Sequence, residues 1–402
     1  MYKTLLSITI AMAISAPSFA GPDMPIQVEN TKSEKKAIQL PTILNPNHHD
    51  DMVVTEPTFD RKGPTIQVAL ILDTSGSMDG LLQNARTHIW RIVNELALAN
   101  KNNESVSIQV SLMEYGKSTL PAYTGYIKTL SPMTYDLDRV SEALFSTYTN
   151  GGDEFAGQAI GKAVHDLQWS NHPDDLKVVI IAGNEEFNQG KVSFLDTIRE
   201  AKSKNIIVNT VFCGPHSQGR AFQWEDAAIL GGGKYMNVSQ DRNIQTIATP
   251  YDDRIAQLGS DLSTTFVAKN TQGRNYMKRS SRMDEQAESL SDSFMADRTL
   301  SKIQSAPATK EFDLVEMAKD DMSMAIETSK EVEQYKGMSE KEVRKDIQDK
   351  LDKKEAITEE LITLRQQRQD YLDNNKPEEV SFGDVLSDAV TEQAKTSGFV
   401  FK

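Results

Sequence analysis

Long apolar runs alternate with amphipathic stretches from about residue 65 to residue 238. Three runs consist mainly of apolar residues, which is typical of strands buried on both faces: TIQVALIL at 65–72, LKVVIIAGN at 176–184 and NIIVNTVFCG at 205–214. Three other segments predict a half-buried strand, an edge strand beside it and a short closing strand: SVSIQVSLMEYG at 105–116, AYTGYIKTL at 122–130 and GKYMNV at 233–238.

The segments between these strands carry apolar residues at helical spacing. They predict helices over 81–99, 137–145, 155–167, 194–201 and 222–230. Strands that alternate with helices pair in parallel through right-handed crossovers. The pattern therefore predicts an α/β fold, a three-layer Rossmann-like sandwich with a mostly parallel central sheet.

The pattern changes after residue 252, where helical stripes replace the apolar runs. Residues 339–372 predict one long, highly charged helix, and Ser339 with Glu342 forms a capping-box pattern at its start. This helix is expected to pack on the α/β domain or to form a coiled coil with a second copy, and partner binding is the alternative. Residues 269–308 are polar and poor in large apolar side chains, which favours a loosely ordered segment.

Four divisions of the chain follow from these patterns. They are a signal peptide at 1–20, a disordered leader at 21–62, the α/β domain at 63–250 and a helical, charged extension at 251–402. The signal peptide is predicted from Lys3, the short apolar segment that follows it, and the small residues around Ala20. We therefore expect export to a bacterial periplasm or secretion beyond it.

Composition narrows the classes of partner. The 402 residues carry a formal net charge of -14 and a pI of about 5.0, which argues against a nucleic-acid partner. After the signal peptide no apolar run approaches the roughly 18 residues of a membrane-spanning helix, so no transmembrane segment is expected in the mature chain. The single cysteine, Cys213, excludes an internal disulfide and is predicted to be a buried, inert thiol.

The first buried strand ends in a cluster of oxygen-bearing side chains. Asp73, Ser75 and Ser77 follow it at every second position, and Gly76 allows the backbone to turn tightly between the serines. Oxygen ligands of this kind suit Mg²⁺. Because function gathers at the carboxyl ends of parallel strands, the loops at 150–154 and 183–186 are expected to reach the same edge.

Residues 64–239 resemble the von Willebrand factor type A domain. The matching segments are LILDTSGSM, TYTNGGDEFAGQAI and VVIIAGNEE. The resemblance implies a metal-ion-dependent adhesion site that holds Mg²⁺, Mn²⁺ or Ca²⁺ and is completed by a carboxylate of a protein partner. It makes Ser75 and Ser77 direct ligands, and it makes Asp73 a ligand that acts through water.

Two loops depart from the family pattern. Asp153 stands where the family has threonine, with Thr149 four positions earlier, and Gly183 stands where the family has aspartate. In one interpretation Asp153 binds the metal directly and Asn184 or Glu185 replaces the missing acid. The added negative charge then gives a more self-sufficient cation site that captures a partner acid weakly. In the other interpretation the site is degenerate and the fold is a scaffold.

Three classes of function remain after these arguments. The first is an exported protein that mediates a metal-influenced protein–protein interaction at the cell envelope, through a partner that the sequence does not name. The second is an envelope-assembly scaffold, with possible self-association through the long helix. The third, a hydrolase, is disfavoured because no G-x-S-x-G motif is present and none of the histidines at 88, 165, 172 and 216 is placed to activate Ser75.

Overall fold

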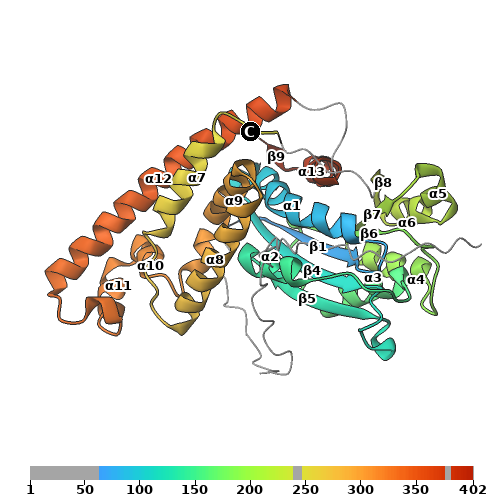
Figure 1. The fold of residues 1–402 in the computed structure, drawn as a ribbon, viewed down its shortest axis with the longest axis horizontal. Coiled ribbons are helices and arrows are strands. Elements are labelled where there is room, and N and C mark those ends of the chain that lie inside the picture. The colour runs from blue at the N-terminus through green and yellow to red at the C-terminus, as the bar shows by residue number, and fades with distance from the viewer. Residues whose placement is uncertain (1–62, 239–246, 376–381, 402) are drawn as a thin grey trace, which may run out of the picture. The chain divides into compact units, whose positions relative to one another are not determined.

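A computed structural model describes residues 63–238, 247–375 and 382–401. The predicted signal peptide and leader lie outside the described residues. The central sheet has the order β5-β4-β1-β6-β7-β8 (Figure 1). Its strands are β1 (Thr65–Asp73), β4 (Ser107–Tyr115), β5 (Ile127–Thr134), β6 (Leu176–Gly183), β7 (Ile206–Cys213) and β8 (Gly232–Val238). Only β5 pairs antiparallel within this sheet, so the predicted mostly parallel α/β fold is confirmed.

Alternate side chains of the central strand enter two separate cores. Val68 and Leu70 face a core shared with α1 (Asp79–Leu96), α2 (Leu137–Ser146) and α13 (Phe382–Thr396). Ala69 and Ile71 face a core shared with α3 (Ala156–Asp166), α4 (Phe194–Ser203) and α6 (Trp224–Leu230), and the short helix α5 (His216–Ala221) precedes α6. Because side chains alternate across a strand, a wholly apolar β1 requires helices on both faces.

The helical region has its own cores. Its helices are α7 (Asp252–Ser263), α8 (Thr271–Leu290), α9 (Asp292–Ser305), α10 (Leu314–Asp320), α11 (Met322–Ser329) and α12 (Glu340–Asn374). The Ser339–Glu342 capping box is present at the start of α12. The apolar stripe of α12 packs within this chain, its first half against α10 and α11 and its second half against α7 and α9.

The expectation of a loosely ordered segment at 269–308 is wrong, because this stretch forms α8 and α9. Their buried positions include charged and polar side chains that a hydropathy pattern counts as exposed. Arg298 is 1% exposed, and its guanidinium bonds the Asp138 carboxylate of α2 at 2.9 Å and the Ser280 hydroxyl at 2.9 Å. Such residues become compatible with burial only when their partners arrive from distant segments.

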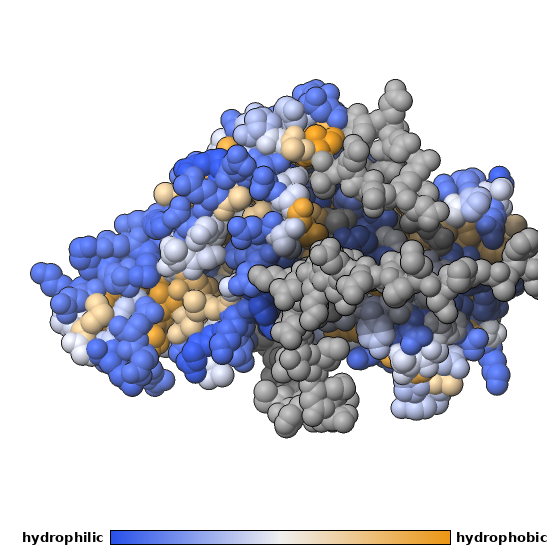
Figure 2. Space-filling view, viewed as in Figure 1, coloured by the Kyte–Doolittle hydropathy of each residue, from blue (hydrophilic) through white to orange (hydrophobic). Residues whose placement is uncertain are grey.

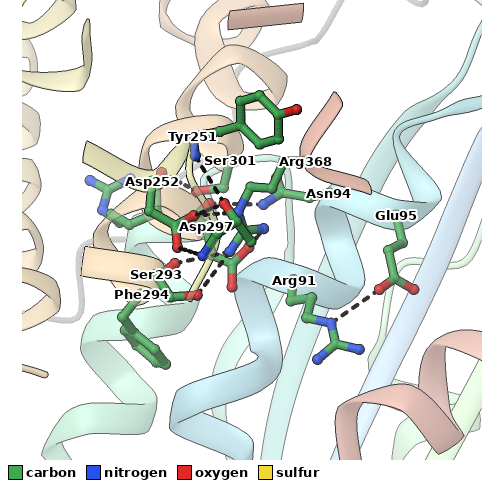
Figure 3. Close-up of polar contacts among 12 residues, drawn as sticks. Arg91, Asn94, Glu95, Tyr251, Asp252, Ser293, Phe294, Asp297, Ser301 and Arg368 are labelled. Atoms are coloured by element: carbon green, nitrogen blue, oxygen red, sulfur yellow. Dashed lines mark hydrogen bonds and ion pairs between the residues drawn. The ribbon is translucent and has the colours of Figure 1, made fainter. Parts of the chain in front are cut away.

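One arginine joins three helices of the helical region (Figure 3). Arg368 on α12 donates to Asp252 on α7 at 2.8 Å and to Asp297 on α9 at 2.7 Å. It also donates to the Ser293 carbonyl at 3.2 Å and the Ser293 hydroxyl at 3.0 Å. The side chain of Asn94 on α1 donates to the backbone carbonyl of Asp297 at 2.8 Å. These contacts link the helical region to the sheet domain.

The last described segment returns to the sheet domain. Helix α13 packs on α1, where Ser387 bonds Glu95, and Gln393 exchanges hydrogen bonds of 2.7 and 3.0 Å with Asn209 of β7. Strand β9 (Val400–Phe401) pairs antiparallel with β2 (Ala99–Lys101), which also pairs with β3 (Glu104–Ser105). The extension predicted from residue 251 onward therefore includes a final part that covers the sheet domain.

None of the helices in the described ranges combines the length and apolarity that crossing a membrane requires.

Candidate cation site at the carboxyl edge of the sheet

The oxygen-bearing turn starts where β1 stops pairing. Asp73 is the last β1 residue in register, opposite Tyr115 of β4, and the next amide, that of Thr74, bonds the Tyr115 carbonyl at 2.8 Å. The Ser75 amide then donates to Asp73 Oδ1 at 2.7 Å, which folds the turn back on the carboxylate. The Met78 amide closes the turn on the Ser75 carbonyl at 3.1 Å, and α1 begins at the next residue.

The hydroxyls predicted to be ligands lie together. Ser75 Oγ and Ser77 Oγ are 3.2 Å apart, and the Asn184 side-chain amide donates to Ser77 Oγ at 2.9 Å. Asn184 follows β6, the strand beside β1 in the sheet. The structure therefore brings Asp73, Ser75, Ser77 and Asn184 to one edge.

Asp73 has an unsatisfied carboxylate oxygen. The residue is 0% exposed, and its Oδ2 has no hydrogen-bond partner among the residues that the structure describes. Burial, opposed by the Ser75 amide and reinforced by the charges of Glu154 and Glu185, raises the pKa of Asp73 to about 7. A buried carboxylate oxygen without a partner carries a large desolvation cost that either a proton or a cation relieves.

A second acid, Glu154, lies beside the turn. Its half-buried carboxyl interacts with the Ser75 side chain, whereas Asp153, the acid predicted from the sequence, is exposed. Burial, followed by the charge of Glu185, raises the pKa of Glu154 to about 7. A Cβ at Gly116 would lie 2.8 Å from Asp73 Oδ1 and 2.9 Å from Glu154 Cγ, so a residue without a side chain is needed where these two acids approach.

The other two predicted residues lie at the rim. Thr149 donates its hydroxyl to Asp79, the first residue of α1, and the next amide, that of Asn150, bonds the Thr74 carbonyl at 2.9 Å. Glu185 is exposed, and its charge acts on both Asp73 and Glu154. Its position is fixed through its backbone carbonyl, which accepts from Trp224 Nε1 at 2.8 Å.

Tyr115 explains the glycine where the resemblance implies an acid. A Cβ at Gly183 would lie 2.4 Å from the Tyr115 hydroxyl and 3.2 Å from Asp73 Oδ2. The Tyr115 hydroxyl donates to the Ala182 carbonyl at 3.3 Å. A side chain at position 183 would therefore point at Asp73, but the tyrosine ring already occupies that space. Strand register places Tyr115 beside Asp73, a relation that the sequence alone did not reveal.

The donor set fits a hard divalent cation. It offers serine hydroxyls, the free oxygen of Asp73, the Glu154 carboxylate and the Asn184 amide oxygen, all of them oxygen ligands. Within the described residues no group of three or more His, Cys, Asp or Glu side chains has the arrangement of a metal site. The serine hydroxyls must therefore take part in binding if an ion is held here.

The histidines and the cysteine lie in other environments. His88 is buried at the contact between α1 and Gly383 of α13, and His165 contacts Glu200 at 3.0 Å. His172 accepts from the Asp174 amide at 3.2 Å, and the His216 ring packs on Tyr235. Cys213 is buried, as predicted, and burial raises the pKa of its thiol far above the usual value. None of these contacts supplies a base to Ser75.

Comparison with known proteins assigns a family to this region. Residues 67–247 match the family model of the von Willebrand factor type A domain. No curated protein matches the chain.

Solved structures with a similar fold include BatB from Bacteroides thetaiotaomicron, with 17% identity and a TM-score of 0.34 over 43% of this chain and 90% of that chain. A von Willebrand factor type A protein from Catenulispora acidiphila has 16% identity and a TM-score of 0.33 over 45% and 39% of the two chains. Proximal thread matrix protein 1 from the mussel byssus, with a zinc-occupied MIDAS motif, has 11% identity and a TM-score of 0.32 over 45% and 43%.

Proposed function

Because residues 67–247 form a von Willebrand factor type A domain, we propose that this protein is an exported binding module that engages a protein partner at the carboxyl edge of its sheet. In this proposal a divalent cation held at the turn after β1 influences the interaction. The observation that carries the proposal is the buried, unpartnered Oδ2 of Asp73 beside two serine hydroxyls 3.2 Å apart.

Each residue of the turn has a distinct part in the proposal. Ser75 and Ser77 present hydroxyl oxygens to the ion, and Asp73 supplies negative charge from beneath. Glu154 takes the part that the sequence assigned to Asp153, because its carboxylate contacts Ser75. A bound Mg²⁺, or alternatively Mn²⁺ or Ca²⁺, supplies a positive centre that attracts oxygen groups.

A binding role agrees better with the contacts of Ser75 than hydrolysis does. A serine nucleophile is commonly activated by a histidine, and no histidine of the described residues is hydrogen-bonded to Ser75. The hydroxyl of Ser75 lies among carboxylates and the second serine, an environment that suits cation ligation. Export to the periplasm rests on the signal-peptide pattern at 1–20.

Titration calorimetry on the chain from residue 21 onward tests the cation site. We expect saturable heat with Mg²⁺, Mn²⁺ or Ca²⁺, and loss of that heat in Ser75→Ala/Ser77→Ala. The matched control is Ser146→Ala, an exposed serine at the end of α2 that bonds only its own helix. Absence of heat for all three ions in the unsubstituted protein contradicts the proposal and favours the scaffold alternative.

Capture from an envelope extract tests the binding role. A partner retained with Mg²⁺, released by EDTA and lost in Ser75→Ala/Ser77→Ala supports the proposal. A partner that is captured equally under all three conditions contradicts it. If EDTA lowers only the melting temperature and changes no capture, the ion stabilises the loops and the protein is a scaffold.

A further inference from the structure

Resting on this function, we propose that the carboxyl edge of the sheet recognises a basic segment of its partner, one that presents lysine or arginine side chains. This inference differs from the sequence-based expectation, in which a partner carboxylate completes the ion's ligands. It depends on the balance of charge around the turn, on the unpartnered oxygen of Asp73, and on an exposed aromatic ring in the adjoining loop.

Acidic residues flank the edge on three separate segments. Asp79 opens α1, Asp153 and Glu154 precede α3, and Glu185 and Glu186 follow β6. All of them except the half-buried Glu154 are exposed. Over the described ranges, no ion pair joins the acids of the last two segments to a lysine or arginine. Their charges therefore remain available to a ligand from outside.

The lysine of the loop after β4 does not offset this charge. Lys117 is 4% exposed, and its Nζ lies 2.7 Å from Glu114 Oε2. The same ammonium group lies 4.2 Å from the centre of the Tyr148 ring. Its charge is thus matched by an acid of its own strand, and Tyr148 already binds one cation on its ring.

A divalent ion at the turn leaves the edge negative. Its two positive charges are matched by Asp73 and Glu154, while Asp79, Asp153, Glu185 and Glu186 keep theirs. A partner carboxylate close to one of these acids is repelled by its like charge. A lysine or arginine at the same place is attracted instead.

The buried acid favours the divalent ion, and the exposed ring favours a cationic group of the partner. Among the described residues, Asp73 Oδ2 has no hydrogen-bond partner although it is fully buried, so the ion of the proposed function supplies the positive charge at the base of the site. Tyr148 is 59% exposed in the loop that carries Asp153 and Glu154, and tyrosine rings bind guanidinium and ammonium groups. The chemistry of the edge therefore fits a chain segment with spaced basic residues.

Two labelled peptides of equal length distinguish the possibilities by fluorescence anisotropy. One repeats Lys-Ser-Gly, and the other repeats Glu-Ser-Gly. With the chain from residue 21 onward in Mg²⁺, we expect the lysine peptide to bind more tightly than the glutamate peptide. Glu185→Gln/Glu186→Gln should weaken the lysine peptide about fivefold, since each exposed charge contributes about 0.5 kcal/mol.

Glu355→Gln/Glu359→Gln on α12 is the matched control, because it removes the same charge from exposed positions outside the sheet domain. An equal loss in both variants means attraction to the whole acidic protein and overturns the inference. Mg²⁺-dependent binding of the glutamate peptide also overturns it while supporting the proposed function. If calorimetry detects Mg²⁺ but neither peptide binds, the inference fails alone; if Mg²⁺ gives no heat either, both fail.

Discussion

Buried carboxylates in two regions of this protein are neutralised in different ways. In the helical region, Asp252 and Asp297 both bond Arg368, at 2.8 and 2.7 Å (Figure 3). At the carboxyl edge of the sheet, Asp73 has one oxygen without any partner, and Glu154 approaches it. Within its described part, the chain thus supplies a cation to the first group and none to the second.

This difference distinguishes acids with a structural role from acids that can bind an external cation. Burial alone would lower the pKa of Arg368, but the charges of Asp297 and Asp252 raise it above its usual value, so the arginine stays charged. The group at the sheet edge instead has carboxyl pKa values of about 7 for both Asp73 and Glu154. A cluster that is left short of positive charge is available to an ion or a partner from outside.

Removing Arg368, the internal cation, should have the largest effect on the stability of the fold. Arg368→Met leaves Asp252 and Asp297 buried without their partner, and we expect a loss of about 3–5 kcal/mol in the free energy of unfolding, measured by urea denaturation. Arg344→Met, which breaks an exposed 3.6 Å pair with Glu340, should cost less than about 1 kcal/mol. Equal losses in the two variants would show that the Arg368 network adds no stability.

Replacing the unpaired acid should remove part of the loss of stability that occurs as pH rises. Because the folded-state pKa of Asp73 is raised from 3.8 to about 7, its stabilising contribution is complete below pH 3.8 and is lost as pH rises through 7. In EDTA, the stability of the unsubstituted protein should therefore fall relative to Asp73→Asn between pH 4 and 8, by about 2–4 kcal/mol. Parallel stability curves for the two proteins would contradict the raised pKa.

Added Mg²⁺ should stabilise the unsubstituted protein more at pH 8 than at pH 5, because protons compete for the same carboxylates. Differential scanning calorimetry at both pH values measures this difference. Asp73→Asn serves as the control, and a Mg²⁺ effect of equal size in that variant places the ion elsewhere.

Gly183, which lies beside Asp73 Oδ2, allows a steric test of its packing against Tyr115. A methyl group at position 183 meets the Tyr115 hydroxyl at 2.4 Å, so Gly183→Ala should cost about 1–3 kcal/mol. Tyr115→Phe removes the clashing atom, and Gly183→Ala should then cost less in that background. A double-mutant cycle by chemical denaturation measures the coupling, and strictly additive losses contradict the packing explanation.

The smallest expected effect distinguishes two neighbouring acids. Glu154→Gln should weaken Mg²⁺ binding about tenfold, whereas Asp153→Asn should weaken it about twofold, since only the Glu154 carboxylate contacts Ser75. Titration calorimetry on both variants measures this ratio, and each serves as the control for the other. A larger loss in Asp153→Asn would restore the ligand assignment made from the sequence.

The sheet domain could be predicted because the patterns that indicate its strands lie within short segments of the sequence. The apolar run of β1 and the alternating pattern of β4 identify these two segments as strands. The oxygen-bearing turn is recognisable from the spacing of Asp73, Ser75 and Ser77. Helices α8 and α9 were not predictable from hydropathy. Their buried residues include Arg298 and Lys302, whose burial depends on Asp138 and Asp284 from other helices.

The details of the candidate site depended on contacts that spacing does not encode. A one-residue difference decides whether Asp153 or Glu154 meets Ser75, and it is set by the path of the loop tied to Thr74 through Asn150. The relation between Gly183 and Tyr115 depends on the pairing of β1 with both β4 and β6. Both features require the register of strands that are far apart in the chain.

The return of α13 changes how the sheet domain can be isolated. Leu386, Val390 and Ala394 belong to the same core as α1 and the even positions of β1, although they lie far beyond the last sheet strand in sequence. A chain cut after residue 250 would lack α13, so the apolar surface that this helix covers would face water and promote aggregation. A minimal version that keeps this core covered must include α13 and also α8 and α9, because Met283, Ala287 and Phe294 belong to the same core.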